Sequence, residues 1–310
     1  MKQLRNILVV VDPTREEQPA ITKAARLASH FDARVQLFAC ETPSSRETRL
    51  MNERVRSGAA GVPGDLPQWM EILSAPLRRD GLEVTLECKS AKHLHPAIRE
   101  RACATQIDLL VKDTHHHSLV QRAFLTNVDW QLIRECGVPL LLTKATPWKE
   151  HPVILAALDP YHEHDKPFLL DHDLLEWGVT LRAALRGTLH GTHTYVPSLL
   201  AAAAVGTAGA AAITPELILD EESKHRARLR ELTLNYDIPA HDLHVDMGSA
   251  ADVIPQIAKG IDADIVAMGA VSRSAAELVL VGHTAERVLE RLEADVLVVK
   301  PPNFSACLPW

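Results

Sequence analysis

Two glycines near the end of the chain stand where a protein backbone could bind an anion. Gly269 follows an apolar run that ends at Met268, and Gly282 precedes an amphipathic segment from Thr284 to Glu290. Glycine has no Cβ, and the first N–H groups of a helix, at the positive end of its dipole, bind phosphate without a catalytic side chain. Glycine is also common at ordinary strand-to-helix turns, so the spacing alone fits a plain turn equally well.

The elements that would position these glycines occur twice in the chain. One apolar run ends in Asp12-Pro13 and a second ends in Asp159-Pro160. An ungapped offset of 156 residues also aligns Asp108 to Lys144 with Asp264 to Lys300, with low identity but the same pattern of element types. The sequence therefore contains one module twice.

Short apolar runs alternate with longer amphipathic segments, which is the pattern of parallel strands joined by helices. We expect strands near 6–11, 33–39, 82–88, 107–112 and 138–143, and again near 153–158, 188–194, 241–246, 264–268 and 295–299. Right-handed crossovers then give an α/β fold of two tandem, doubly wound, parallel five-stranded sheets. The prolines in 146–152 predict a linker between a domain at 1–147 and a domain at 152–310. Ligands of such sheets bind outside the carboxyl ends of the strands, where Asp12, Asp113, Asp159 and Gly269 fall.

Composition excludes some classes of protein. The chain has 310 residues, 46% of them hydrophobic, which is enough for a core in each of two domains. Its net charge of −7 argues against a general nucleic-acid binder, since such binders need a basic face. The five cysteines are odd in number, lack CxxC spacing and mostly lie in or beside apolar runs, as reduced structural thiols do. We also expect no export leader before the first strand. We therefore expect a cytoplasmic protein.

Two further features have a plain interpretation and a functional one. The uncharged segment from Val196 to Ile213 is rich in alanine and glycine, so we expect a connecting segment and no membrane span. An apolar lid or partner surface is the alternative. The histidines at 115–117, and His162 with His164, are interpreted as exposed loop residues and not as a metal site, because consecutive residues of an extended segment point to alternate sides.

Several strings resemble those of the universal stress protein family, and the resemblance covers essentially the whole chain. The residues that carry it are Asp12-Pro13, Asp129-Trp130 followed by Cys136, Met268-Gly269, Gly282 to Glu286, and Val298 to Pro301. The resemblance implies a tandem member with an adenine nucleotide alpha hydrolase-like, Rossmann-like fold. It further implies a pseudo-twofold arrangement in which the terminal strands of the two halves pair. A homodimer stays open, since the tandem already supplies this pairing.

The family's nucleotide-binding pattern is Gly, two residues, Gly, nine residues, Gly, then Ser or Thr. Carried over by position, it gives Gly269 after Met268, Ser272 at the second glycine, Gly282, and His283 at the hydroxyl position with Thr284 next; Asp159 is the adenosine contact. The resemblance thus implies ATP or another adenine nucleotide, with or without Mg²⁺, in the second domain. His283 also stands at the expected N-cap of the last helix, with Glu286 three residues later as in a capping box.

The first domain departs further from the pattern. Asp113, His116 and Thr126 occupy its three glycine positions, which puts a carboxylate where a triphosphate needs a neutral cradle. We expect no nucleotide there, and an architectural role for this domain.

The sequence contains no Gly-x-Ser-x-Gly elbow, no Walker lysine motif and no HExxH. We therefore predict a non-catalytic, nucleotide-responsive stress protein that acts through unknown protein partners. Two alternatives remain. One is a nucleotide-independent interaction protein or carrier of an apolar ligand, with 199–213 as a pocket wall, and the other is a weak ATPase.

Overall fold

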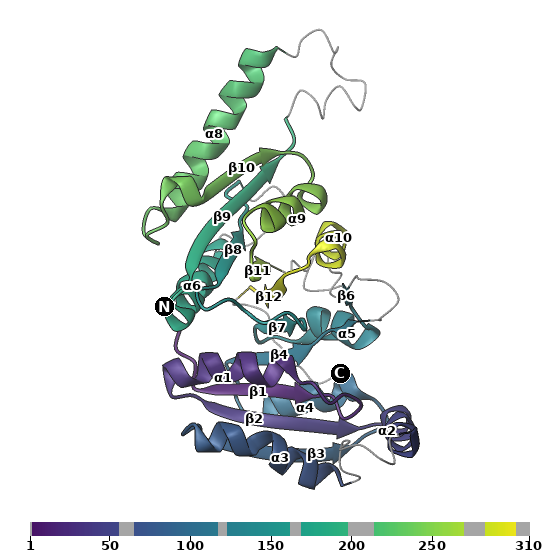
Figure 1. Ribbon diagram of the computed structural model, residues 1–310. Helices are drawn as coiled ribbons and strands as arrows, with labels where there is room; N and C mark the ends of the chain where they lie inside the picture. Colours follow the sequence, from purple (N-terminus) through teal and green to yellow (C-terminus); the bar gives the residue numbers. More distant parts are fainter. Residues whose placement is uncertain are drawn as a thin grey trace.

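The computed structural model describes residues 2–55, 65–116, 123–161, 169–197, 214–269 and 283–301. Its central feature is one ten-stranded sheet in the order β10-β9-β8-β11-β12-β7-β4-β1-β2-β3 (Figure 1). The strands are β1 (Asn6–Val11), β2 (Arg34–Glu41), β3 (Val84–Ser90), β4 (Leu109–Asp113), β7 (Leu140–Thr143), β8 (Val153–Ala157), β9 (Thr188–Tyr195), β10 (Leu243–Met247), β11 (Ile265–Gly269) and β12 (Asp295–Val299). Each lies within about two residues of its expected range, so the predicted α/β fold is confirmed.

Helices cover both faces of the sheet. They are α1 (Pro19–Phe31), α2 (Pro43–Val55), α3 (Leu66–Arg79), α4 (Leu94–Ala104), α5 (Asn127–Glu135), α6 (Leu169–Leu185), α8 (Pro215–Thr233), α9 (Ala250–Gly260) and α10 (His283–Arg291). Residues of α1, α3, α6 and α8 pack in the hydrophobic cluster on one face, and residues of α4, α5, α9 and α10 pack in the cluster on the other. In β1, Val9 and Val11 join the first cluster, while Leu8 and Val10 join the second. Burial on both faces is why such strands appear in the sequence as unbroken apolar runs.

The two halves meet at β7 and β12, which pair antiparallel with Leu141 opposite Leu297. The other strand pairs of the large sheet are parallel. Each half repeats one strand order outward from this seam, which gives the pseudo-twofold arrangement of Figure 1. The expected pairing of the terminal strands is therefore confirmed. The division into a domain at 1–147 and a domain at 152–310 stays a prediction.

Three features were not expected. A short hairpin, β5 (His115–His116) with β6 (Ala123–Phe124), follows β4. The linker 146–152 has neither helix nor strand, as predicted, yet Trp148 is buried and its indole N–H donates to Asp295 at 2.7 Å. The linker thus belongs to the interface between the halves and is not a loose tether.

Cys103 is disulfide-bonded, so the expectation of reduced cysteines is wrong at that position, whereas Cys40, Cys88 and Cys136 are free thiols.

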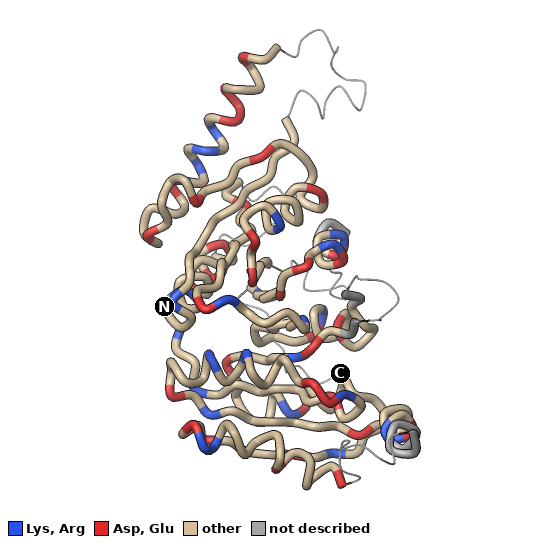
Figure 2. Tube along the Cα trace, in the orientation of Figure 1, with Lys and Arg blue, Asp and Glu red and all other residues tan. Residues whose placement is uncertain are grey.

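The second half contains a longer insertion between β9 and β10, which includes α8 and a short 3-10 helix, η2 (Ala240–Asp242). Most acidic residues of α8 lie in its first half and its basic residues lie in its second half (Figure 2). Three oppositely charged pairs lie three or four residues apart: Lys224 with Asp220, Arg226 with Glu222, and Arg228 with Glu231. Residues 198–213, which hold most of the uncharged segment, lie outside the described residues. Among the helices that the structure describes, none has both the length and the apolar character needed to cross a bilayer.

Candidate functional site

The carboxyl ends of two neighbouring strands bring Asp159 and Gly269 to the same edge of the sheet. β8 and β11 pair in parallel with Ala157 opposite Met268, and Gly269 ends β11. Asp159 follows β8 by two residues, and its N–H donates to Asp171 Oδ1 at 3.2 Å, which ties this strand end to the first turn of α6. Met268 is buried in the core cluster that contains α10, so its side chain serves packing.

Gly269 has a packing reason to be glycine. A Cβ added there would lie 2.6 Å from Cδ2 of Leu170, a fully buried residue in the first turn of α6. Any side chain at this position would force Leu170 to move inside a dense core, which is costly. The core therefore accounts for this glycine whether or not a phosphate binds, and sequence spacing could not distinguish the two reasons.

The helix expected to bind an anion is α10, which begins at His283. The expectation that His283 caps this helix is wrong, because His283 and Thr284 are its first two residues. Gly282 and Ser272 lie outside the described residues. Glu286 is then the fourth helical residue, and its carboxylate accepts a hydrogen bond from Arg134 of α5 at 3.1 Å. Glu286 thus joins the two halves.

In the first half, the chain's own carboxylate occupies the equivalent helix N-terminus. Thr126 Oγ1 accepts the Asp129 N–H at 3.2 Å, and Asp129 Oδ2 accepts the Thr126 N–H at 2.7 Å, which completes a capping box on α5. Lys112 of β4 pairs with Asp129 Oδ1 at 2.8 Å, and both side chains are buried. A phosphate could enter only by displacing this paired carboxylate. The Thr-x-x-Asp spacing is a signal that sequence reasoning missed.

Asp113, which replaces Gly269 in the first half, is also buried. Its Oδ1 accepts the Ala20 N–H at 2.9 Å, at the start of α1, and the Thr143 hydroxyl at 2.6 Å. Burial raises the pKa of Asp113 to about 6, against the opposing effect of these hydrogen bonds and of the Lys112 and Lys23 ammonium groups. Asp113 is therefore a second carboxylate, besides Asp129, that disfavours phosphate binding in the first half.

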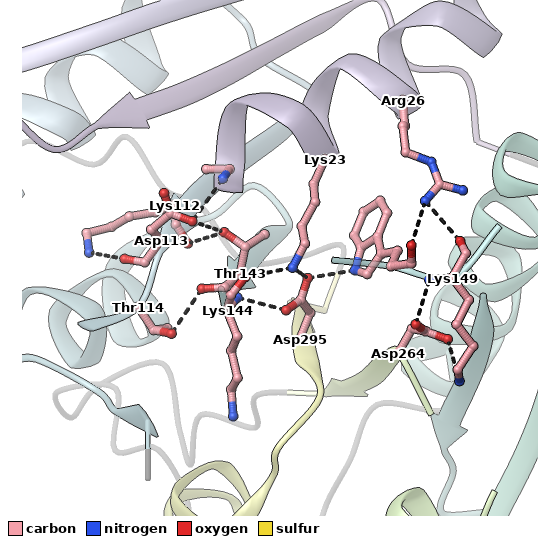
Figure 3. Close-up of polar contacts among 12 residues, drawn as sticks. Lys23, Arg26, Lys112, Asp113, Thr114, Thr143, Lys144, Lys149, Asp264 and Asp295 are labelled. Atoms are coloured by element: carbon pink, nitrogen blue, oxygen red, sulfur yellow. Dashed lines mark hydrogen bonds and ion pairs between the residues drawn. The ribbon is translucent and has the colours of Figure 1, made fainter. Parts of the chain in front are cut away.

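Asp295, the first residue of β12, gathers donors from the first half and the linker (Figure 3). It accepts hydrogen bonds from Lys23 Nζ at 2.7 Å, the Lys144 N–H at 2.8 Å and Trp148 Nε1 at 2.7 Å. The Lys23 and Asp295 side chains are only 4% and 3% exposed. Burial raises the pKa of Asp295 while the Lys23 ammonium opposes that rise. No sequence motif could predict this cluster, since Lys23 and Asp295 lie 272 residues apart.

Histidines of the second half form two ring-to-ring pairs. His193 Nε2 lies 2.9 Å from His225 Nδ1, which joins β9 to α8, and His190 Nδ1 lies 3.1 Å from His244 Nε2. Burial lowers the pKa of both His190 and His244. Within the described ranges, no group of three or more His, Cys, Asp or Glu residues is arranged to hold a metal ion. The histidines at 117, 162 and 164 lie outside those ranges.

Known proteins match both halves of this chain. The model of the universal stress protein family matches residues 3–144 and 170–300. Universal stress protein E of Escherichia coli (strain K12) is 28% identical over 98% of this chain and 96% of its own length. Universal stress protein E homolog of Haemophilus influenzae is 27% identical over 96% of this chain and 98% of its own length. A crystal structure from Pseudomonas aeruginosa UCBPP-PA14 has a TM-score of 0.76 at 27% identity and covers 97% of this chain and 95% of that one.

Proposed function

Because the chain belongs to the universal stress protein family, we propose that it is a non-catalytic stress-response protein that binds ATP or a related adenine nucleotide in its second half. One observation carries the proposal: Asp159 follows β8 by two residues and Gly269 ends β11, so both lie at the carboxyl edge of two neighbouring parallel strands, and α10 is the next helix described after β11. Open parallel sheets bind their ligands at such an edge. The adenosine would contact Asp159, and the phosphates would lie near Gly269, Ser272 and Gly282 and the first turn of α10, with or without Mg²⁺.

The first half supports this assignment by contrast. Its equivalent helix N-terminus already holds Asp129 paired with Lys112, and Asp113 stands where the second half has Gly269. A single nucleotide per chain follows, with the first half serving as the architectural partner. The Arg134 to Glu286 bond then gives the first half a direct contact with the helix that would bind phosphate, a route by which occupancy could reach a protein partner in the cytoplasm.

The test is a calorimetric titration of ATP with magnesium into the metal-stripped chain. Saturable binding of one nucleotide per chain is expected, and Asp159→Asn should weaken it by at least about tenfold, which is 1.4 kcal/mol. The matched control is Asp12→Asn, which makes the same change at the equivalent strand end of the first half and should leave binding unchanged. Absence of binding, or equal losses in the two variants, would contradict the proposal.

A second candidate is a nucleotide-independent carrier of an apolar ligand. It is favoured by four exposed apolar side chains near the carboxyl edge of the second half: Tyr161 after β8, Leu169 at the start of α6, Val196 after β9 and Met247 at the end of β10. Such a patch on a protein surface often marks a binding site. Mass spectrometry of an organic extract of the purified protein would decide, since a bound apolar molecule without nucleotide would favour this candidate.

A further inference from the structure

The first half contains a cavity that the proposed nucleotide site does not use. It has a volume of about 270 Å³ and lies at the carboxyl ends of β1, β2 and β4. Its polar lining includes Asp12, Thr14, Cys40, Thr42, Lys112 and Asp113. At about 30 Å³ for each water-sized group, it has room for a small organic molecule of roughly nine non-hydrogen atoms.

Asp113, a residue of this lining, contains a buried oxygen to which no described residue donates a hydrogen bond. Asp113 is only 7% exposed, and its Oδ1 already accepts two hydrogen bonds. Its Oδ2 is buried, and no described residue donates a hydrogen bond to it. A buried carboxylate oxygen without a donor is costly, and an N–H or O–H group supplied by a ligand would remove that cost.

The charges of the lining favour a positive ligand. Asp12 and Asp113 are the acidic residues of the described lining. Lys112 is the basic residue in the described lining, but its ammonium is already paired with Asp129 at 2.8 Å and donates to the Asp113 carbonyl at 2.9 Å. An anion would therefore meet two carboxylates, while a cation would form a charge-assisted hydrogen bond, roughly twice as strong as a neutral one.

The remaining walls are apolar. Val10, Val11, Pro13 and Leu94 line the same cavity. A ligand of this size would place its carbon atoms against these side chains and its polar end against Asp113. An alkyl chain with a terminal amine meets both requirements.

We propose that the cavity beside Asp113 binds a small aliphatic ammonium ion, with its N–H groups donating to Asp113 Oδ2 and its carbon chain against the valines and Leu94. The first half is then a ligand-binding domain of opposite charge preference to the second. The change from glycine to Asp113 removes the phosphate cradle and creates the site for a cation. Cation and nucleotide would bind to different halves of one chain.

The test titrates n-butylamine and putrescine into the full chain by calorimetry near neutral pH, with n-butanol as the uncharged probe of the same shape. We expect one amine per chain, binding by n-butanol at least about tenfold weaker, and a loss of at least about tenfold in Asp113→Asn. The matched control is Asp237→Asn, which removes a carboxylate whose side chain is 98% exposed. Circular dichroism would verify that both variants fold.

Two further measurements separate this proposal from the nucleotide site. Saturating ATP should leave the stoichiometry of amine binding unchanged, and Asp159→Asn should leave amine affinity unchanged. The proposal is overturned if neither amine binds at millimolar concentration, if n-butanol binds as well as n-butylamine, or if Asp113→Asn binds amine as tightly as the original chain. Failure of ATP to bind would not affect it.

Discussion

Lys144 and Lys300 occupy equivalent positions in the two halves and reach across the molecule in opposite directions. Lys144 Nζ donates to the carbonyl of Leu292, just after α10, and Lys300 Nζ donates to the carbonyl of Arg134 in the last turn of α5 at 3.3 Å. A positive charge at the carboxyl end of a helix is favourable. Each half therefore caps the last helix of the other, in addition to the pairing of β7 with β12.

These two lysines predict a pH dependence of stability. Burial lowers the pKa of each to about 8, from an ordinary value of 10.5, although Asp295 and Glu293 raise that of Lys144. The unfolded chain then binds more protons than the folded chain between pH 8 and 10.5. The cost of burying the two ammonium groups is fully present below pH 8 and decreases as pH rises through that range, so the free energy of unfolding rises with pH there. Urea denaturation should show the stability difference between the original chain and Lys144→Met moving in favour of the original chain as pH rises. A difference that is independent of pH would contradict this assignment.

The pair of Lys23 and Asp295 predicts a large loss of stability. Asp295→Asn would leave the Lys23 ammonium buried without its counter-ion, so we expect the free energy of unfolding to fall by about 3–5 kcal/mol. Chemical denaturation would measure it. Glu286→Gln is the matched control at a more exposed pair between the halves, whose side chains are 39% and 30% exposed, and it should cost no more than about 1 kcal/mol. Similar losses in the two variants would show that the buried pair contributes no more to the free energy of unfolding than the exposed pair.

Gly269 and Leu170 predict a rescue. Gly269→Ala should destabilise the fold by about 1–3 kcal/mol, because its Cβ would overlap Leu170. The double variant with Leu170→Ala should lose less stability than the sum of the losses of the two single variants, because the smaller side chain removes the overlap. A double-mutant cycle would measure this difference. If ATP binds the double variant normally, glycine at 269 serves packing; if binding stays lost while stability recovers, it serves the phosphate.

The capping box of the first half predicts a graded pair of losses. Thr126→Ala removes a helix cap and should cost about 0.5–2 kcal/mol. Asp129→Asn also removes the partner of buried Lys112, so it should cost about 3–5 kcal/mol. Thermal denaturation of both variants tests the order. The reverse order would show that Lys112 does not depend on Asp129.

The raised pKa of Asp113 predicts that its replacement by asparagine stabilises the fold at neutral pH. Its folded pKa of about 6 lies above its ordinary 3.8, despite the opposing ammonium groups of Lys23 and Lys112. The folded state therefore holds this proton more tightly, and the associated stability is fully present below pH 3.8 and lost as pH rises through 6. Asp113→Asn should thus be more stable than the original chain at neutral pH, by about 1–3 kcal/mol, with the gain vanishing toward pH 4. A constant difference across this range would contradict the shift.

The strands could be predicted from the sequence because each is a local apolar run buried on both faces. Their pairing at the seam followed from the family resemblance, since nothing local in Leu141 or Leu297 indicates an antiparallel partner. The repeat also located the edge where Asp159 and Gly269 meet, because parallel strands bring their carboxyl ends together. These predictions rest on periodicity and topology, which the sequence carries directly.

Other parts of the site depended on contacts between distant residues. The sequence could not show that Leu170 presses on Gly269, or that Lys23 and Asp295 share a buried pair, because those contacts exist only after the layers pack. The cap expected at His283 differs from the structure by one residue, because α10 begins at His283 itself. The capping box of Thr126 and Asp129 could be predicted from its spacing, because both of its side chains lie within one turn of α5.

Because β7 and β12 pair with each other, the outer strands of the sheet are β3 and β10, one from each half. Edge strands with charged side chains, such as Glu87 and Lys89 in β3 or Asp246 in β10, resist the addition of further strands. The seam itself forms within one chain, so dilution cannot separate its two sides, and its formation follows first-order kinetics. The two halves should therefore stay joined at any protein concentration, however scarce the protein is.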